Sequence, residues 1–499
     1  MESTLSKKQK WQKDLETTWL PCLLMALVCF LSAFLNDKST DDIAKVGLCF
    51  FCGFLFVVVY LYLNKMLSWQ TAITLIFIAG VFVRLCYIFY TGYRVRQHDV
   101  WSVDSGKGHM AYIQYIATNL AIPDTNETWQ FYHPPLHHIL AGLLYRFLSH
   151  GSLQPEQIAE KLQFLTMFYS CLTMITCDRL FAALKLKDST RFLADCVIAF
   201  HPTFFQVGGD LNNDMLASFL AILSILYLVK WWNEQKTKQL AFCGLFLGLS
   251  MMAKISGAIL AFPYAFLFLY RLVKNIKTPK RLIKQYLLFG IISIPIGMWY
   301  PIRNLLRFHQ NILYVPDFGP NSGQYIGDIS PFHRLFAIPS GQLAFPYQCW
   351  ANGDEPGLGS NIFLSAFKTS VFGEHSLGAG PWAYILLYSF IFLAVVSFFY
   401  MLWNAFDKKN FKENPTHALW TILIGSLLIS FISFCLKYTS VCSQDFRYLT
   451  ITLPVVALYF ALAIEKAKPR WLQPCFLCLL VAFCLSSYMT YAVPAIWGL

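Results

Sequence analysis

Long apolar segments alternate with short polar loops along most of the chain. A helix needs about 20 predominantly apolar residues to cross a bilayer, and thirteen segments of this chain come close to that length. We expect helices over residues 18–36, 45–64, 71–91, 163–184, 190–207, 214–232, 239–254, 256–274, 284–302, 381–403, 417–437, 446–464 and 471–492. The pattern therefore predicts an all-α polytopic membrane protein with a bundle of about 13 transmembrane helices.

Two long stretches, residues 92–162 and 303–380, interrupt this alternation. Within the first, residues 133–148 are apolar in places but carry three histidines and an arginine. Such side chains are costly at full depth in a bilayer, so we expect an amphipathic helix on the membrane surface rather than a span. The second stretch is rich in glycine and proline. It predicts a long loop with short helices over the outer mouth of the bundle.

The composition agrees with this interpretation. The chain has 499 residues, 57% of them hydrophobic and 13% charged, whereas soluble domains carry roughly 25% charged residues. The net charge of +12 does not indicate a nucleic-acid partner, because the basic residues lie in short loops between apolar segments. Basic residues in such loops set membrane topology. The polar, basic N-terminus leads into a full-length span, so we expect no cleavable signal peptide.

The charge distribution also predicts which loops share a face. A cytoplasmic N-terminal tail puts the basic loops around 185–191, 236–238, 271–284, 408–412 and 466–470 on the cytoplasmic side, as the positive-inside rule requires. The same alternation puts residues 92–162, 208–213, 303–380 and 438–445 on the outer face. Cys349 and Cys442 are the cysteines outside apolar segments, and both fall on this face. We expect a disulfide between them, but the spacing of the 15 cysteines indicates neither a disulfide framework nor a metal site in a loop.

Several polar groups recur where the helices meet this outer face. They are Asp99 and Asp104, His133 followed by two prolines, Asp210 and Asp214, and Lys254. Structural roles are open for each. The loop carboxylates can pair with nearby Arg94, Arg96 or Lys107, His133 can cap a surface helix, and Asp210 or Asp214 can cap the next span. Lys254 can extend to the interface, and Arg447 can anchor a span there.

The order of these groups resembles the GT-C glycosyltransferases, in particular the protein O-mannosyltransferases and the bacterial lipid A aminoarabinose transferases. The resemblance is carried by HD (98–99), YHPPLHH (132–138), NNDML (212–216) and GLSMMAKISG (248–257), with weaker support from KTSVFGE (368–374) and DFRYLTITLP (445–454). Mannosyltransferases have Asp-Glu after the first span, whereas here His98-Asp99 follows the third, so two N-terminal helices look added. The chain has no WWDYG motif, which argues against the oligosaccharyltransferase branch. It also lacks the DxD motif of nucleotide-sugar enzymes, which fits a lipid-linked donor.

The resemblance implies an inverting glycosyltransferase. A sugar would pass from a polyprenyl-phosphate donor to a hydroxyl of a glycan, lipid or protein, on the periplasmic or lumenal side. Asp99 would be the general base, with Asp104 as its rival, and Asp214 a second catalytic carboxylate. The residues expected to bind substrate are His133, Asp210, Lys254, Arg303 and Arg447, of which the three cations would hold the phosphate. We expect no cofactor and no metal ligands, although a divalent metal stays open.

The resemblance also divides the chain. Residues 1–70 would be a cytoplasmic tail and two added helices, 71–302 the catalytic module with outer loop 92–162, 303–380 the long outer loop, and 381–499 the C-terminal helices. The expected location is a bacterial inner membrane, or the endoplasmic reticulum in a eukaryote.

Two other classes of protein fit a multispanning chain. A secondary transporter or lipid-linked-glycan flippase would carry ionisable groups near the bilayer midplane on repeat-related broken helices. Here the acidic residues lie at span ends, and the sequence has no evident repeat. A polymerase or ligase of envelope polymers would be expected to have outer loops richer in arginine than these. Both comparisons favour the glycosyltransferase.

Overall fold

The computed structural model describes residues 19–277, 279–317, 319–349, 359–377, 380–407 and 416–494. Every regular element in these ranges is a helix, and an isolated bridge between Tyr325 and Ser440 is the β-type pairing found there. The predicted all-α class is therefore confirmed. The N-terminal lysines and the loop at 408–412, used to predict topology, lie outside the described residues.

The N-terminal half contains the helices up to the centre of the bundle. They are α2 (Leu20–Ser32), α3 (Thr40–Leu63), α4 (Trp69–Tyr90), α5 (Gly108–Asn119), α6 (Leu136–Leu148), α7 (Pro155–Ala183), α8 (Asp188–Phe200), α9 (Thr203–Gly209), α10 (Asp214–Glu234) and α11 (Thr237–Ala253). Local chemistry fixes several starts. Ser39 and Ser68 accept hydrogen bonds from backbone N–H groups in the first turns of α3 and α4, which satisfies donors that a helix leaves unpaired.

The C-terminal half contains the remaining helices. They are η3 (Ile255–Leu260), α12 (Ala261–Lys274), α13 (Lys280–Phe308), α14 (Pro331–Phe336), α15 (Ser340–Ala344), α16 (Ile362–Phe372), α17 (Pro381–Phe406), α19 (Thr416–Lys437), η4 (Val441–Gln444), η5 (Phe446–Thr452), α20 (Leu453–Lys466) and α21 (Leu472–Ala492). The expected short helices in 303–380 are thus α14, α15 and α16 within the described part of that loop.

Nine helical segments of the described chain are long and apolar enough to cross a membrane. They are Thr40–Leu63, Trp69–Tyr90, Asp214–Glu234, Ile255–Lys274, Lys280–Phe308, Pro381–Phe406, Thr416–Lys437, Val441–Lys466 and Leu472–Ala492. Three shorter apolar helices, α2, α11 and α16, accompany them. The chain is therefore a multi-pass membrane protein, but several expected spans are shorter or more interrupted than the apolar pattern indicated.

Two of these departures have clear causes. The span expected at 18–36 is helical only over α2, and the polar residues 36–39 precede α3. The span expected at 190–207 divides at His201-Pro202 into α8 and α9. Proline has no backbone N–H and disfavours a helical conformation in the residue before it. His201 is accordingly extended, with φ −74° and ψ 121°.

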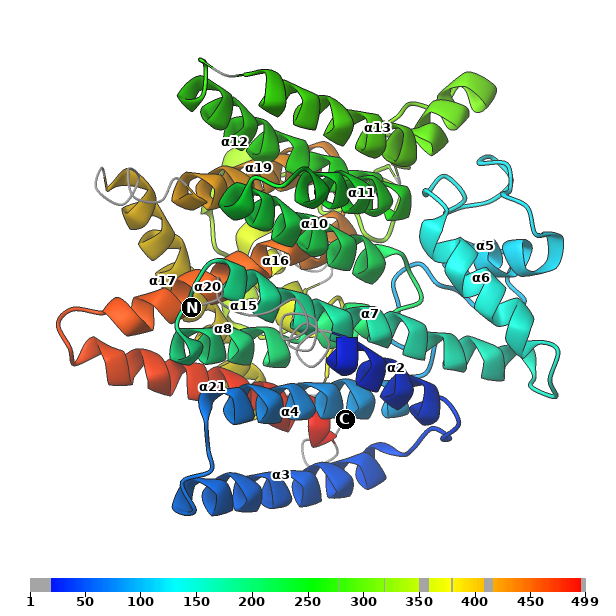
Figure 1. Ribbon diagram of the computed structural model, residues 1–499. Helices are drawn as coiled ribbons and strands as arrows, with labels where there is room; N and C mark the ends of the chain where they lie inside the picture. The colour runs from blue at the N-terminus through cyan, green and yellow to red at the C-terminus, as the bar shows by residue number, and fades with distance from the viewer. Residues whose placement is uncertain are drawn as a thin grey trace.

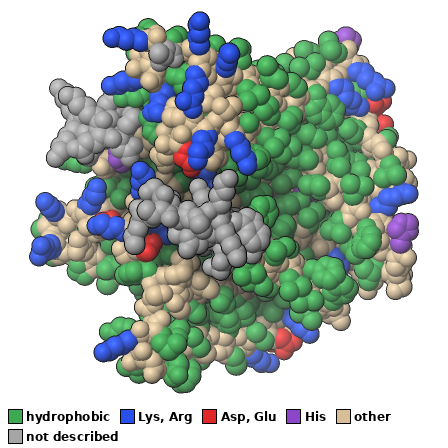
Figure 2. Space-filling view, in the orientation of Figure 1, with side chains coloured by type: hydrophobic (Ala, Val, Ile, Leu, Met, Phe, Trp, Pro, Cys, Tyr) green, Lys and Arg blue, Asp and Glu red, His purple; other side chains and the backbone are tan. Residues whose placement is uncertain are grey.

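The long helices lie side by side with their axes along a common direction (Figure 1). Helices α10, α11, α12 and α13 form one side, α3 and α4 the opposite side, and α5 and α6 lie together at one end. The α12–α13 and α20–α21 connections lie at the other end (Figure 1). Hydrophobic side chains cover a broad zone of the visible surface between two groups of charged residues (Figure 2). This distribution suits a bilayer-embedded bundle with two aqueous ends.

The expected disulfide is absent from the described structure. Cys349 and Cys442 are both free thiols. Cys349 instead lies 3.8 Å from the buried Lys368 ammonium. The prediction of a disulfide between Cys349 and Cys442 was therefore wrong.

Candidate functional site

A cavity of about 540 Å³ lies where the segment 92–162 meets helices from both halves of the chain. Its volume falls within the range of small-molecule sites. Its polar part is lined by Asp99, His109, Tyr132, His133, Asn213, Asp214, Lys254 and Arg447. Its apolar part is lined from η3, α12, α19 and η5 by Ile259, Phe262, Leu427, Phe431, Phe434 and Ile451. The cavity thus joins a charged end to an apolar groove.

The α10 N-terminus supplies the first carboxylate. Asn212 accepts a hydrogen bond from the Asp214 backbone N–H at 2.9 Å, and Asn213 Nδ2 donates to the Ala253 carbonyl at 2.7 Å. These bonds hold the start of α10 against the end of α11. Asp214 lies in the first turn rather than at the cap, because Asn213 is the N-cap residue. Its carboxylate is free to meet cations in the cavity.

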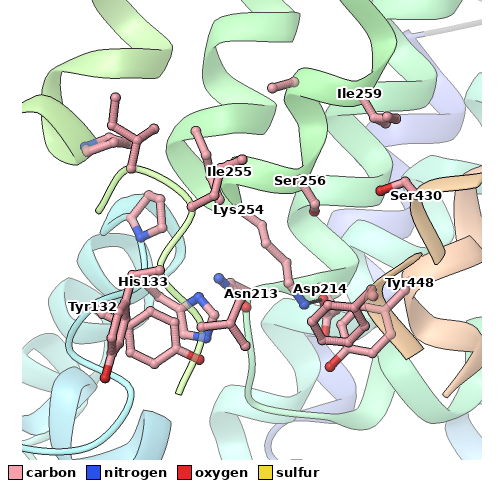
Figure 3. Close-up of a pocket in the computed structure, with 18 of the residues that line it drawn as sticks. Tyr132, His133, Asn213, Asp214, Lys254, Ile255, Ser256, Ile259, Ser430 and Tyr448 are labelled. Carbon is pink, nitrogen blue, oxygen red and sulfur yellow. Dashed lines mark hydrogen bonds and ion pairs between the residues drawn. The ribbon is translucent and has the colours of Figure 1, made fainter. Parts of the chain in front are cut away.

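Lys254 lies at the junction of α11 and η3, where the backbone is extended. Its ammonium forms an ion pair with the Asp214 carboxylate, and the two side chains are only 14% and 5% exposed. Figure 3 shows the Lys254 side chain extending to Asp214 beside the ring of Tyr448. The interruption of the helix between α11 and η3 therefore positions a cation in the cavity.

Arg447 connects the two cavity carboxylates. Its Nη2 lies 3.6 Å from Asp99 Oδ2 and its Nη1 lies 3.9 Å from Asp214 Oδ2, while its side chain is 7% exposed. The Tyr448 ring lies against both cations, with its centroid 5.0 Å from Lys254 Nζ and 5.2 Å from Arg447 Cζ. Cation–π contacts of this kind favour a positive charge in a desolvated site. Two carboxylates and two cations therefore form one connected group.

Asp99 is held by an unusual turn. Arg96, Asp99 and Trp101 all have positive φ, with Asp99 at +62°, a region that residues other than glycine rarely adopt. The turn is fixed to the start of α5, because the His109 N–H donates to the Asp99 carbonyl at 2.9 Å. Gly108 makes this approach possible, since a Cβ there would lie 2.4 Å from the same carbonyl oxygen. The Asp99 side chain reaches the cavity and keeps 32% of its surface exposed.

The neighbouring residue, His98, lies in a buried acidic cluster and not in the cavity lining. Its Nδ1 is 2.7 Å from Asp210 Oδ2, which also accepts the His98 backbone N–H, and its Nε2 is 3.2 Å from Asp445 Oδ2. Burial and Arg447 lower the pKa of His98, but the neighbouring carboxylates of Asp210 and Asp445 outweigh them and hold it well above its ordinary value. Burial also raises the pKa of nearby Glu374 to about 7.

A layer of histidines forms the wall opposite α10. His109 Nδ1 lies 2.9 Å from His138 Nε2, and the Tyr112 ring stacks on His138 with centroids 4.0 Å apart. His133 stacks on His109 at 5.3 Å and faces the cavity. Burial lowers the pKa of His109, His133 and His138 well below the ordinary value. These rings are neutral, and hydrogen-bonding rather than ionic, at neutral pH.

The structure brings five of the eight predicted site residues into one cavity. They are Asp99, His133, Asp214, Lys254 and Arg447. The other three do not line it. Asp104 is exposed on the loop, Asp210 is fully buried against His98, and Arg303 contacts the Pro123 carbonyl at 3.0 Å and Asp124 at 3.5 Å.

Several lining residues were not singled out from the sequence. Tyr132, Asn213 and Tyr448 lie inside the motifs YHPPLHH, NNDML and DFRYLTITLP, next to residues that were chosen. His109 lies outside every motif and could not be selected without the α5–α6 packing. Glu374 and Asp445 end or begin motifs noted only for their resemblance, and their proximity to His98 depends on the fold.

Comparison with known proteins agrees with the motif resemblance. A sequence model of the dolichyl-phosphate-mannose-protein mannosyltransferase family matches residues 156–299, a range that contains Asp210, Asp214 and Lys254. No curated protein matches the chain.

Among solved structures, ArnT from Cupriavidus metallidurans in the apo state has a TM-score of 0.51 and 12% sequence identity, over 86% of this chain and 77% of that one. AglB from Archaeoglobus fulgidus, an oligosaccharyltransferase in complex with an inhibitory peptide and a dolichol-phosphate, has a TM-score of 0.49 and 13% identity, over 85% of this chain and 55% of that one. Sequence identities this low indicate a similar fold and do not indicate a shared substrate or residue roles. The chain therefore resembles the GT-C glycosyltransferases in fold, and its residues 156–299 are similar to the dolichyl-phosphate-mannose-protein mannosyltransferases.

Proposed function

We propose that this protein is an inverting glycosyltransferase that moves a sugar from a polyprenyl-phosphate donor to an acceptor hydroxyl. One observation carries the proposal: a single cavity joins a carboxylate, two cations and an apolar groove. These are the three features that such a donor and its reaction require. The family match and the GT-C-like fold support the same chemistry.

Asp99 is the proposed general base. Its carboxylate accepts the proton of the acceptor hydroxyl while that oxygen attacks the anomeric carbon of the donor. The bond from the anomeric carbon to the phosphate oxygen breaks, and the electron pair leaves with polyprenyl phosphate. A single displacement inverts the anomeric configuration. Asp99 suits the role better than Asp104, because it lines the cavity and is partly accessible.

Lys254 and Arg447 are the proposed phosphate ligands. Negative charge grows on the phosphate as the bond breaks, and cations already fixed in place stabilise that charge without reorganising. The Tyr448 ring and Asp214 hold both cations in position. Asp214 therefore acts on the charge and orientation of the cations, and also offers a hydrogen-bond acceptor to the sugar. Arg303 has no part in this arrangement, because it holds the first outer loop through Asp124.

The apolar groove is the proposed seat of the polyprenyl chain. It runs from the charged end along α12 and α19, where Phe262, Leu427 and Phe431 line it. An isoprenoid chain suits this lining, because packing contacts with apolar side chains replace its contacts with lipid tails. We further propose that the α5–α6 end faces the periplasm or lumen, because the basic α12–α13 and α20–α21 connections lie at the opposite end.

The neutral His133 ring completes the cavity. It is proposed to hydrogen-bond the sugar or acceptor, since a buried imidazole of lowered pKa donates or accepts without adding charge. The acceptor can be a glycan, a lipid or a protein, and we propose the class rather than one member.

The proposal is tested by incubating purified protein with a panel of defined polyprenyl-phosphate sugars and mixed acceptors. Asp99→Asn should reduce transfer by about 100- to 10,000-fold, the usual contribution of a general base. Asp104→Asn is the matched control from the same loop and should retain the wild-type rate. Equal rates for Asp99→Asn and wild type would overturn the assignment of the base, and no transfer from any donor would overturn the function.

A further inference from the structure

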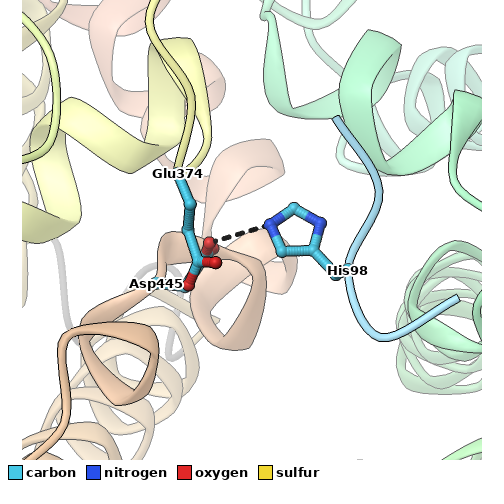
Figure 4. Close-up of side chains that lie close together, drawn as sticks. All are labelled: His98, Glu374 and Asp445. Carbon is cyan, nitrogen blue, oxygen red and sulfur yellow. Dashed lines mark ion pairs between the residues drawn. The ribbon is translucent and has the colours of Figure 1, made fainter. Parts of the chain in front are cut away.

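The acidic cluster behind the cavity has the geometry of a metal site. We propose that His98, Glu374 and Asp445 bind a divalent transition-metal ion, with Zn²⁺ as the ion of choice. One ligand atom from each residue lies within 4.8 Å of the other two. Figure 4 shows the three side chains pointing toward one another from three separate segments of the chain.

The potential ligand atoms are buried and lack other partners. His98 Nε2 and Asp445 Oδ2 form no hydrogen bond, although their side chains are only 5% and 3% exposed. Glu374 Oε1 is likewise buried without a hydrogen bond. Buried polar atoms are nearly always satisfied by protein or water. These three atoms lie within 4.8 Å of one another, so a single cation can accept lone pairs from all of them.

The hydrogen bond on the other side of the imidazole supports this inference. His98 Nδ1 lies 2.7 Å from Asp210 Oδ2, so its N–H donates to that carboxylate. A metal-binding histidine almost always donates its second ring N–H to a carboxylate or carbonyl in this way. When Nδ1 carries the only ring proton, the Nε2 lone pair faces the lone pairs of Asp445, and a metal ion can take the place of a second ring proton. Two acceptors 3.2 Å apart repel each other unless a cation lies between them.

The distances suit zinc. Zinc binds histidine nitrogen and carboxylate oxygen at about 2.0–2.2 Å, and tetrahedral geometry then puts neighbouring ligand atoms about 3.4 Å apart. The observed 3.2 Å between His98 Nε2 and Asp445 Oδ2 is close to that separation. One imidazole with two carboxylates is a ligand set that zinc accepts, whereas calcium takes six to eight oxygen ligands. Three protein ligands also leave one coordination position open.

The charge balance favours a bound cation as well. Five carboxyl groups gather in the cavity and the cluster behind it, namely Asp99, Asp210, Asp214, Glu374 and Asp445. The permanent cations in contact with them are Lys254 and Arg447. Buried charges of one sign are costly unless they are compensated. A divalent ion on His98 removes most of this excess, whereas a proton on His98 supplies one charge.

An ion at this point would fix the turn that carries the base. His98 precedes Asp99, and the two residues share the positive-φ turn at 96–101. Bonds from the ion to Glu374, after α16, and to Asp445, before η5, would tie that turn to two elements of the C-terminal half. The sequence does not indicate the site, because each ligand comes from a different segment.

Metal uptake tests the proposal without any sugar donor, so its failure and the failure of transfer are separate results. Chelator-treated, detergent-purified protein is dialysed against Zn²⁺, Mn²⁺ or Ca²⁺, and bound metal is measured by plasma mass spectrometry. Wild type should bind one Zn²⁺ per chain. Glu374→Gln and His98→Gln should lose that ion, and Asp210→Asn should weaken binding by about 10- to 100-fold, as a lost partner of a metal-bound histidine does. Glu127→Gln, at an exposed position of the first outer loop, should bind like wild type.

Thermal unfolding adds a second measurement for variants that fold poorly. Zn²⁺ should raise the unfolding temperature of the metal-free wild type and of Glu127→Gln, and should leave Glu374→Gln unchanged. Wild type that takes up well below one ion per chain would overturn the proposal, and a protonated His98 would then occupy the cluster. Equal zinc binding by Glu374→Gln and wild type would also overturn it, because the ion would lie elsewhere.

Discussion

His98 and Asp99 are consecutive residues whose side chains have different surroundings. His98 is buried between Asp210 and Asp445, whereas Asp99 lines the cavity beside Arg447. The positive φ of Asp99 turns the chain between these two directions. A shift of this turn would therefore move the proposed base and the buried acidic cluster together.

A substitution at Gly108 tests whether this turn controls activity. Gly108 and Gly106 both have positive φ, so alanine costs roughly 1–2 kcal/mol of backbone strain at either position. Only at Gly108 does a Cβ meet the turn, 2.4 Å from the Asp99 carbonyl oxygen, while Gly106 has nothing within 4 Å. We expect Gly108→Ala to lower kcat/KM for sugar transfer by about 100-fold, since small misplacements of a reacting group have effects of that size.

Gly106→Ala is the matched control and should keep most of the activity with a similar loss of thermal stability. Equal activity losses in the two variants would show that backbone strain alone, and not the position of Asp99, limits the reaction.

The α5–α6 pair contributes a histidine layer to the site. His109, His137 and His138 are each at most 2% exposed. Burial lowers the pKa of His109 and His138 well below the ordinary value, and that of His137 to about 4. The buried surroundings favour neutral imidazole rings. Protonation of these rings should therefore destabilise this wall of the cavity.

Protonation of this histidine layer should therefore make the fold less stable in acid. A histidine whose pKa is lower in the folded state than in the unfolded state binds more protons when unfolded, so acid favours unfolding. The loss should begin as the pH falls below the ordinary value of 6.5. Each histidine should contribute about 1.4 kcal/mol per pH unit until its folded-state pKa is reached. Thermal unfolding in detergent across this range measures the slope.

His138→Gln should reduce that slope, and His309→Gln, at an exposed position, should not change it. An unfolding temperature that stays constant as the pH falls below 6.5 would contradict the neutral-ring interpretation.

At the scale of whole elements, the sequence predicted best where apolar segments are long and uninterrupted. Helices α3, α4, α17 and α21 lie close to their expected ranges. The positions at which helices begin and end depended on local chemistry that hydropathy does not describe. Pro202 divides α8 from α9, as its missing N–H requires, but the early start of α7 at Pro155 reflects a capping box between Gln154 and Gln157 in a polar segment. Hydropathy does not record such caps.

The arrangement of the whole molecule agrees with the charge parity of the loops. Helices α5 and α6 lie at one end and the α12–α13 connection at the other (Figure 1). Lysine and arginine side chains gather at that second end (Figure 2). The positive-inside rule favours the proposed orientation, with the cavity at the outer face and the basic loops in the cytoplasm.

Labelling with a membrane-impermeant maleimide tests this orientation. Glu127 and Lys277 are both exposed and belong to opposite ends of the bundle. Glu127→Cys should react in intact cells, and Lys277→Cys should react only after permeabilisation. The unsubstituted protein gives the background from its 15 native cysteines. Reaction of Lys277→Cys from outside would reverse the orientation and remove the proposed periplasmic or lumenal site.

The sequence predicted those site residues that lie near one another along the chain. Asp99, His133, Asp214 and Lys254 follow one another in the first half, and a motif order was enough to associate them. Which carboxylate faces the cavity could not be predicted, because it depends on the turn at Asp99 and on Gly108. Arg303 was chosen by its place at a span end, yet the direction of its side chain depends on Asp124.

The proposed reaction in the cavity breaks the bond between sugar and polyprenyl phosphate. Its most direct test is a time course of purified protein in detergent, where no second compartment exists and transport leaves no product. Labelled donor and acceptor are supplied, and free polyprenyl phosphate and glycosylated acceptor are measured together. With wild type the two products should appear in equal amounts, with inverted anomeric configuration, and Asp99→Asn should form neither at a comparable rate. Intact donor after prolonged incubation with wild type would contradict the proposed reaction.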